Sequence, residues 1–205
     1  MHRLAATPGG WTPTQNDGAE GVIFVDQTPA PLVFLTSADT DIQCLDRALP
    51  DLPESFPALR VTNLLQLQQQ LTIDTYADDV LQHARLIIVR LLGGRAYWPY
   101  GLEVLRTVAD SGADLIVLPG DDRPDLELMS HSTVPLQVAN QLWRYLTEGG
   151  PENVGNGLMA VCDRILGTHF NPPPPAAVPK IGLYTPIPSP EDKPHASLLP
   201  PPSSP

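Results

Sequence analysis

The chain has 205 residues, with 23 acidic against 12 basic side chains and a formal net charge of −11 at pH 7. This length accommodates one α/β domain with a buried core and a tail. The clustered basic face of a nucleic-acid binder is missing, so nucleic acids and anionic membranes are excluded as partners.

The composition also limits the compartment. No run of about 18 apolar residues predicts a membrane span, and the first residues lack the apolar stretch of a secretory signal. The two cysteines, Cys44 and Cys162, stand far apart and outside any C-x-x-C pattern. We therefore expect a cytoplasmic protein with reduced thiols and without a disulfide framework.

The first quarter of the chain predicts an arm, two strands and a helix. Residues 1–20 are rich in Gly, Pro, Thr and Asn without an apolar period, which is typical of a flexible arm. Short apolar runs at 22–25 and 32–36 predict strands. The polar stretch 37–41 then resembles a helix cap, and the helical spacing that follows ends at Pro50.

The next part predicts a second strand and helix pair. Residues 59–65 favour a strand. A helix is expected to begin near Thr75, whose hydroxyl could act as the cap while Asp78 reaches back to it. Four residues are expected to form the buried stripe of this helix: Tyr76, Val80, Leu81 and Ala84.

The middle of the chain carries the strongest strand signal. Residues 85–92 are nearly continuously apolar, as an interior strand covered on both faces should be. Gly93-Gly94 predicts a tight turn, Pro99 suits the first turn of a helix, and Gly112 ends that helix. Residues 114–118 favour the next strand.

Together these repeated strand and helix units predict one α/β domain over residues 21–167. Because the connections are short and the strands apolar, we expect a flavodoxin-like parallel sheet with helices on both faces. Two further helices, at 134–146 and 154–166, are separated by Gly149-Gly150-Pro151. Their pattern leaves open whether they close this domain or begin another.

The end of the chain has a different composition. From Asn171 onward lie 13 of the 25 prolines, with little charge. Such a segment cannot bury a core, so we expect residues 168–205 to form a proline-rich linker or tail that is disordered beyond about residue 171. A ligand for an aromatic groove is the less favoured alternative.

Candidate contact residues follow from the predicted sheet, because open parallel sheets bind ligands at the carboxyl ends of their strands. The loops at 37–41, 93–98 and 119–125 should meet there. The candidates for substrate or interface contact are Gly93, Gly94, Arg95, Tyr97, Trp98, Asp121, Asp122 and His131.

Each candidate also has a structural interpretation. The glycines could serve only the turn, with Tyr97 and Trp98 packing on a neighbouring domain. Asp121 and Asp122 could hold a hard cation, but turn formation and capping are favoured for them. For His131 a capping role is favoured over catalysis.

Known catalytic and cofactor patterns are not found in the sequence. It contains no P-loop, no complete dinucleotide fingerprint, no histidine pair at metal-ligand spacing and no nucleophile elbow. We therefore assign no catalytic residue and no metal site, and we expect the chain to bind no cofactor.

Several stretches resemble the amino-terminal region of the large subunit of cobaltochelatases, the CobN and magnesium-chelatase large-subunit family. The similar segments are residues 22–42, 63–105, 118–135 and 141–158. The most distinctive pieces are Leu-Gly-Gly at 92–94 with Tyr-Trp-Pro-Tyr-Gly at 97–101, and Leu-Pro-Gly-Asp at 118–121.

The resemblance implies a ligase that forms nitrogen–metal bonds. In this family ATP-driven Co²⁺ insertion into hydrogenobyrinic acid a,c-diamide leads to cobalamin, and sister enzymes load magnesium into protoporphyrin. The large subunit holds the tetrapyrrole, while separate ring-forming ATPase subunits hydrolyse ATP. The implied partners are those ATPase subunits, the remainder of the large subunit and the tetrapyrrole.

The family's large subunits are far longer than this chain. The resemblance therefore implies a truncated or split large subunit that is inactive by itself. The alternatives are a non-catalytic tetrapyrrole-binding or subunit-interaction module and an inert truncated product.

Overall fold

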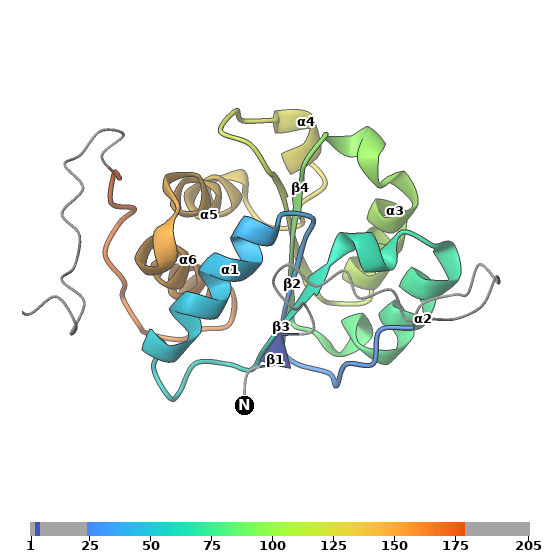
Figure 1. The fold of residues 1–205 in the computed structure, drawn as a ribbon, viewed down its shortest axis with the longest axis horizontal. Helices are drawn as coiled ribbons and strands as arrows, with labels where there is room; N and C mark the ends of the chain where they lie inside the picture. The colour runs from blue at the N-terminus through green and yellow to red at the C-terminus, as the bar shows by residue number, and fades with distance from the viewer. Residues whose placement is uncertain (1–2, 5–23, 179–205) are drawn as a thin grey trace, which may run out of the picture.

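The computed structural model describes residues 3–4 and 24–178 (Figure 1). Within these residues, five parallel strands form one sheet in the order β1-β3-β2-β4-β5. The strands are β1 (Arg3–Leu4), β2 (Leu32–Thr36), β3 (Leu59–Asn63), β4 (Leu86–Leu91) and β5 (Asp114–Pro119). Apart from the short edge strand β1, this is the start of the flavodoxin-like order 2-1-3-4-5, so the predicted fold class is confirmed.

Helices cover both faces of the sheet (Figure 1). The α-helices are α1 (Asp39–Ala48), α2 (Gln70–Asp79), α3 (Pro99–Asp110), α4 (Leu126–Met129), α5 (Leu136–Glu148) and α6 (Gly150–Ile165). Short 3-10 helices are η1 (Leu49–Asp51), η2 (Leu64–Leu67), η3 (Leu81–His83) and η4 (Arg95–Tyr97). Helices α1, α5 and α6 lie on one face, and α2 and α3 lie on the other. Among the described residues, no helix has the length and apolar character needed to cross a membrane.

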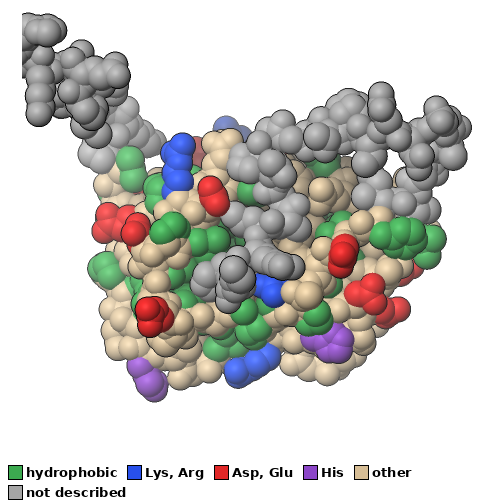
Figure 2. Space-filling view, turned by 60° about the horizontal axis from the view of Figure 1, so that its bottom comes forward, with side chains coloured by type: hydrophobic (Ala, Val, Ile, Leu, Met, Phe, Trp, Pro, Cys, Tyr) green, Lys and Arg blue, Asp and Glu red, His purple; other side chains and the backbone are tan. Residues whose placement is uncertain are grey.

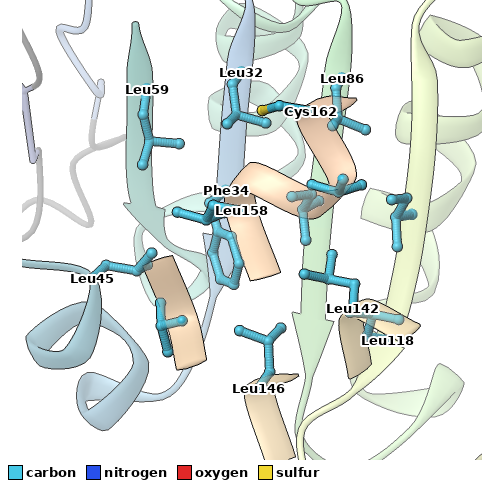
Figure 3. Packing of buried hydrophobic residues seen from close by; sticks show 14 of the residues in the cluster. Leu32, Phe34, Leu45, Leu59, Leu86, Leu118, Leu142, Leu146, Leu158 and Cys162 are labelled. Atoms are coloured by element: carbon cyan, nitrogen blue, oxygen red, sulfur yellow. The ribbon is translucent and has the colours of Figure 1, made fainter. Parts of the chain in front are cut away.

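The sheet divides the core into two layers, because successive side chains of a strand point to opposite faces. In β2, Leu32 and Phe34 pack beneath α1, α5 and α6, whereas Val33 and Leu35 pack beneath α2 and α3. Figure 3 shows the first layer, with Phe34 surrounded by leucines from the strands and helices. Burial on both faces explains why β4 is apolar along nearly its whole length.

Helices α5 and α6 pack on the same face of the sheet as α1. Both contribute to the layer shown in Figure 3, for example through Leu142 and Leu158. A β-carbon built on Gly157 would lie 2.8 Å from Cβ of Tyr145, so glycine lets the two helices pack closely.

The strand predicted at residues 22–25 is wrong for its described residues. Residues 24–25 are not in a strand, and residues 22–23 lie outside the described part of the chain. The side chain of Phe24 is 62% exposed, so the apolar run is not buried by a sheet. The position beside β3 is taken instead by Arg3 and Leu4, two residues of the predicted flexible arm.

Helix α2 begins five residues earlier than predicted. Gln70 is its first residue, and Thr75 and Asp78 lie inside it rather than at a cap. Thr72 and Ile73 are buried, so the inward face starts before the residues that the pattern selected. All four residues of the expected stripe are buried. Only Tyr76 lies in α2, however, because the helix ends at Asp79 and Leu81 belongs to η3, so the stripe as part of one helix is wrong.

The described part of the proline-rich tail is held by contacts. Residues 171–178 form hydrogen bonds with α5 and α6, so the expected disorder beyond residue 171 is wrong for this portion. The composition indicates that such a segment cannot form a core of its own. It does not show that side chains of α5 and α6 form hydrogen bonds with the backbone of the segment. Residues 179–205 lie outside the described part.

Candidate functional site

The topological switch point of the sheet lies between β2 and β4, where ligands commonly bind in this fold. Here a buried ion pair occupies it. The guanidinium of Arg90 donates to Oδ1 of Asp41, and Oγ1 of Thr36 donates to Oδ2 of the same carboxylate at 2.7 Å. Nε of Arg90 also donates to the carbonyl of Pro119 at 3.4 Å. This ion pair therefore connects β2, α1, β4 and β5 at the carboxyl edge.

The ion pair was not found from the sequence. Arg90 is the one charged residue within β4, and the side chains of Arg90 and Asp41 are only 9% and 11% exposed. A charged residue inside an otherwise apolar buried strand needs a partner, because an unpaired buried charge is costly. That rule could have singled out Arg90, but it could not have chosen Asp41 from among the neighbouring carboxylates.

The turn after β4 has the conformation that two glycines allow. Gly93 and Gly94 have φ values of +89° and +70°, which side chains with a β-carbon rarely adopt. The expected need for glycine at this turn is thus confirmed. The turn leads into η4, where Arg95 and Tyr97 are exposed.

Trp98 is a core residue, and its prediction as an exposed contact is wrong in this conformation. Its side chain is 4% exposed, and its indole N–H donates to the carbonyl of Leu67 at 3.2 Å. The ring lies against Gly101, where an added β-carbon would be 2.0 Å from Cε2 of Trp98. The Trp-Pro-Tyr-Gly sequence therefore packs the start of α3 against η2.

The two most distinctive sequence pieces meet at this edge of the sheet. The backbone N–H of Gly120 donates to the carbonyl of Leu91 at 2.7 Å. A β-carbon on Gly120 would lie 2.7 Å from Cγ of Leu92, closer than such atoms pack. Gly120 thus lets the loop after β5 lie directly against the end of β4.

Two cavities open on the rim formed by these loops. The first, of about 500 Å³, is lined by Leu91, Gly94, Pro119, Asp121, Arg123, Pro124, Asp125 and Leu126. The second, of about 380 Å³, is lined by Arg95, Pro99, Leu102, Glu103, Arg106 and His131. The structure therefore brings Gly94 together with Asp121, and Arg95 together with His131. Gly93, Tyr97 and Asp122 line neither cavity.

Several polar groups on the rim have structural partners. Oδ1 of Asp121 accepts from the N–H of Arg123 at 3.1 Å, and Oδ1 of Asp125 accepts from the N–H of Leu128 at 2.9 Å, at the start of α4. These contacts match the turn and capping roles that aspartate favours. Within the described residues, no group of three or more His, Cys, Asp or Glu side chains could hold a metal ion.

The rim also exposes apolar surface. Leu92, Tyr97 and Leu126 are 41%, 39% and 65% exposed. Leu92 directly follows β4, Tyr97 ends η4, and Leu126 begins α4. The nearby ion pair between Arg95 and Glu127 is 3.4 Å long and well exposed, so it contributes little stability.

The opposite edge of the sheet looks different. Figure 2 brings the amino ends of the strands toward the viewer and shows apolar and acidic side chains scattered among polar ones. A clustered basic surface does not appear on the coloured part of this view.

Comparison with known proteins identifies relatives of this chain. No protein-family model matches it. It is 41% identical over 186 residues to the aerobic cobaltochelatase subunit CobN of Pseudomonas aeruginosa, and 37% identical over 187 residues to the same subunit of a Sinorhizobium species. Each match covers 91% of this chain but only 14% of the relative.

The fold leads to the same group of proteins. The catalytic subunit of cobaltochelatase from Mycobacterium tuberculosis superposes with a TM-score of 0.61 and is 28% identical. The match covers 76% of this chain and 12% of that subunit. The resemblance noted in the sequence is thereby confirmed: the chain is a homologue of a segment of the aerobic cobaltochelatase subunit CobN.

Proposed function

We propose that this chain forms one domain of a cobaltochelatase large subunit and contributes to cobalt insertion as part of a complex. The observation that carries the proposal is the 41% identity to CobN over 186 residues. The chain spans 14% of the length of the curated relatives, so in this proposal the remaining steps of the reaction belong to other parts of the complex.

The reaction proposed for the complex is the ATP-dependent loading of Co²⁺ into hydrogenobyrinic acid a,c-diamide during cobalamin biosynthesis. ATP is hydrolysed on separate ring-forming subunits in this proposal. The sequence contains no P-loop, which agrees with that division of labour. Cobalt is the substrate of the complex, and this chain by itself is inactive.

The carboxyl rim is the proposed contact surface for the tetrapyrrole or for the remaining large subunit. Exposed apolar side chains such as Leu92, Tyr97 and Leu126 are suited to association, because their burial releases water. Arg95 and His131 could add hydrogen bonds to carboxylates at the second cavity. Trp98 is excluded from this role by its burial.

A reconstituted insertion assay tests the proposal. The chain, the remaining large subunit and the ATPase subunits are mixed with Co²⁺, ATP and the diamide, and each component is omitted in turn. We expect insertion only when all components are present. Full activity without this chain, or insertion by the chain alone, would contradict the proposal.

Rim variants separate a contact role from a purely structural one. Tyr97→Ala and Arg95→Glu should weaken association with the remaining subunit while leaving the melting temperature nearly unchanged, because both side chains are exposed. Arg47→Glu, at the exposed end of α1, provides a matched charge control that should have no effect. Equal effects of Arg95→Glu and Arg47→Glu would reject the rim as the contact surface.

The alternative is a non-catalytic module that holds the tetrapyrrole. The apolar and cationic lining of the second cavity favours it. Titration of the chain with hydrogenobyrinic acid a,c-diamide or protoporphyrin, followed by the macrocycle's absorption band, separates the two. Saturable uptake that is lost in Arg95→Glu favours the module, and no uptake favours a rim that contacts protein.

A further inference from the structure

The segment after α6 turns back and runs antiparallel to that helix. Residues 168–178, called the strap below, contact the last turns of α6 first and its amino end last. From Asp163 to Asn153 the helix spans about 15 Å at 1.5 Å per residue. From Asn171 to Ala176 a polyproline II segment also spans about 15 Å at 3.1 Å per residue. The two lengths match, so anchors at both ends can be occupied together.

The carboxyl end of α6 holds the start of the strap through one carboxylate. Asp163 accepts hydrogen bonds from the N–H groups of Phe170 and Asn171 at 2.8 and 2.7 Å, and from the hydroxyl of Thr168 at 2.7 Å. Burial alone would raise the pKa of Asp163, but these donors outweigh it and hold the pKa below its usual value. Asn171 has a φ of +51°, which turns the chain into the proline run.

The amino end of α6 recognises the first residue after the four prolines. Asn153 is only 4% exposed. Its Nδ2 donates to the carbonyl of Ala176 and its Oδ1 accepts from the N–H of Ala176, both at 2.9 Å. Prolines 172–175 have no N–H, so Ala176 offers the first backbone donor after them. The side-chain amide therefore pairs with both backbone groups of that residue.

Helix α5 adds two further contacts to the strap. The buried side chain of Tyr145 donates its hydroxyl proton to the carbonyl of Pro173 at 2.5 Å. Burial raises the pKa of Tyr145, so this hydroxyl remains a donor at neutral pH. Oε2 of Glu148 accepts from the N–H of Val178 at 3.2 Å. The hydrogen bonds from both helices thus go mainly to backbone groups of the strap.

This arrangement has the properties of a peptide site. A proline run is already extended before it binds, so little conformational entropy is lost. With the strap in place, Tyr145 and Asn153 are buried and their polar groups are paired with its backbone, as buried polar groups require. Neither observation depends on the chelatase proposal.

We propose that the surface between α5 and α6, formed by Tyr145, Glu148, Asn153 and Asp163, is a recognition site for an extended, proline-rich peptide. The strap is its ligand within the same chain. Occupation of the site fixes where the chain leaves the domain, at the amino end of α6.

The test uses a full-length chain whose strap is weakened while the site stays intact. Asn171→Pro and Ala176→Pro together remove two bonded N–H groups, and proline cannot adopt the positive φ of Asn171. A fluorescent peptide of residues 168–180 is then added and its anisotropy is measured. Circular dichroism first verifies that each variant is folded.

The wild type should bind the added peptide weakly, because the tethered strap competes at an effective concentration on the order of millimolar. The strap variant should bind it saturably and at least about tenfold more tightly. Adding Asn153→Ala to that variant should abolish the gain. Adding Asn156→Ala instead, a change on the same helix that bonds to no strap residue, should leave the gain unchanged.

Two results would overturn the proposal. One is a strap variant that binds no peptide saturably, and the other is equal binding with and without Asn153→Ala. Amide exchange in the wild type is an independent measurement: the N–H of Ala176 should be protected, and Asn153→Ala should remove that protection. An unprotected Ala176 in the wild type also counts against the proposal.

Discussion

Replacing Gly101 by alanine tests the packing at the start of α3. The added β-carbon would lie 2.0, 2.2 and 2.3 Å from Cε2, Cδ2 and Cζ2 of Trp98. Carbon atoms in contact are normally about 3.5 to 4.0 Å apart, so the indole would have to move by well over 1 Å. Trp98 is buried and its N–H is bonded to Leu67, so that movement disturbs the core.

The size of the effect can be bracketed. Forcing an extra methyl group into a packed core costs about 1 to 3 kcal/mol, and complete displacement of a tryptophan costs about 3 to 5 kcal/mol. Better helix propensity returns at most about 1 kcal/mol. Gly101→Ala should therefore destabilise the chain by about 1 to 4 kcal/mol, and at about 2 to 4 °C per kcal/mol the melting temperature should fall by several degrees.

A second helical glycine provides the control. A β-carbon on Gly155 would lie 3.5 Å from Cδ2 of Leu52, an ordinary contact. Gly155→Ala should therefore stabilise the chain by about 0.4 to 1 kcal/mol. Urea and thermal unfolding followed by circular dichroism measure both variants under the same conditions.

A double-mutant cycle links the effect to one side chain. If Trp98 causes the clash, Gly101→Ala should be nearly neutral in a Trp98→Ala background, because the space is then free. An equal loss of stability in both backgrounds, or a Gly101→Ala variant as stable as Gly155→Ala, would refute the reasoning.

Three further predictions concern charged and titratable groups. Arg90→Met should lower the free energy of unfolding in urea by about 3 to 5 kcal/mol, because it leaves the carboxylate of Asp41 buried without its cationic partner. Adding Asp41→Leu should restore much of this loss. Equal stability of the single and double variants would contradict the buried ion pair. Burial raises the pKa of the Cys162 thiol to about 12, so iodoacetamide at pH 8 should modify the half-buried Cys44 first, and faster modification of Cys162 in folded protein would contradict its burial. Folding lowers the pKa of Asp163, so the stability that its carboxylate gives the strap should be complete above the pKa of the unfolded chain, about 4, and be lost as the pH falls through the folded pKa. Amide exchange of the strap, measured over this pH range, follows the loss. The same pH dependence in Asp163→Asn would contradict the role of this carboxylate.

Local sequence signals predicted much of the sheet. The strands at 86–91 and 114–119 and the helix starting at Pro99 were found because apolar runs, glycines and prolines report directly on backbone geometry. Helix α2 was misplaced because Thr75 resembles a cap, and only tertiary packing shows that the inward face begins at Thr72.

The candidate site was harder to predict because its residues depend on distant partners. Trp98 was interpreted as a surface aromatic, and its burial results from contacts with Leu67 and Gly101. Likewise, nothing in the sequence connects Asn153 with Ala176, although they form a close pair. Such pairings follow from the arrangement of whole elements rather than from local pattern.

The parallel sheet also has a consequence for synthesis on the ribosome. Phe34 of β2 is separated from its partner Val61 in β3 by 61 − 34 = 27 residues, and from its partner Ile88 in β4 by 88 − 34 = 54 residues. As the chain emerges from its amino end, β2 can pair with β3 well before β4 is available. One edge of an apolar central strand must therefore wait unpaired until β4 emerges, and open strand edges promote aggregation. The nascent chain should depend most on chaperones during that interval.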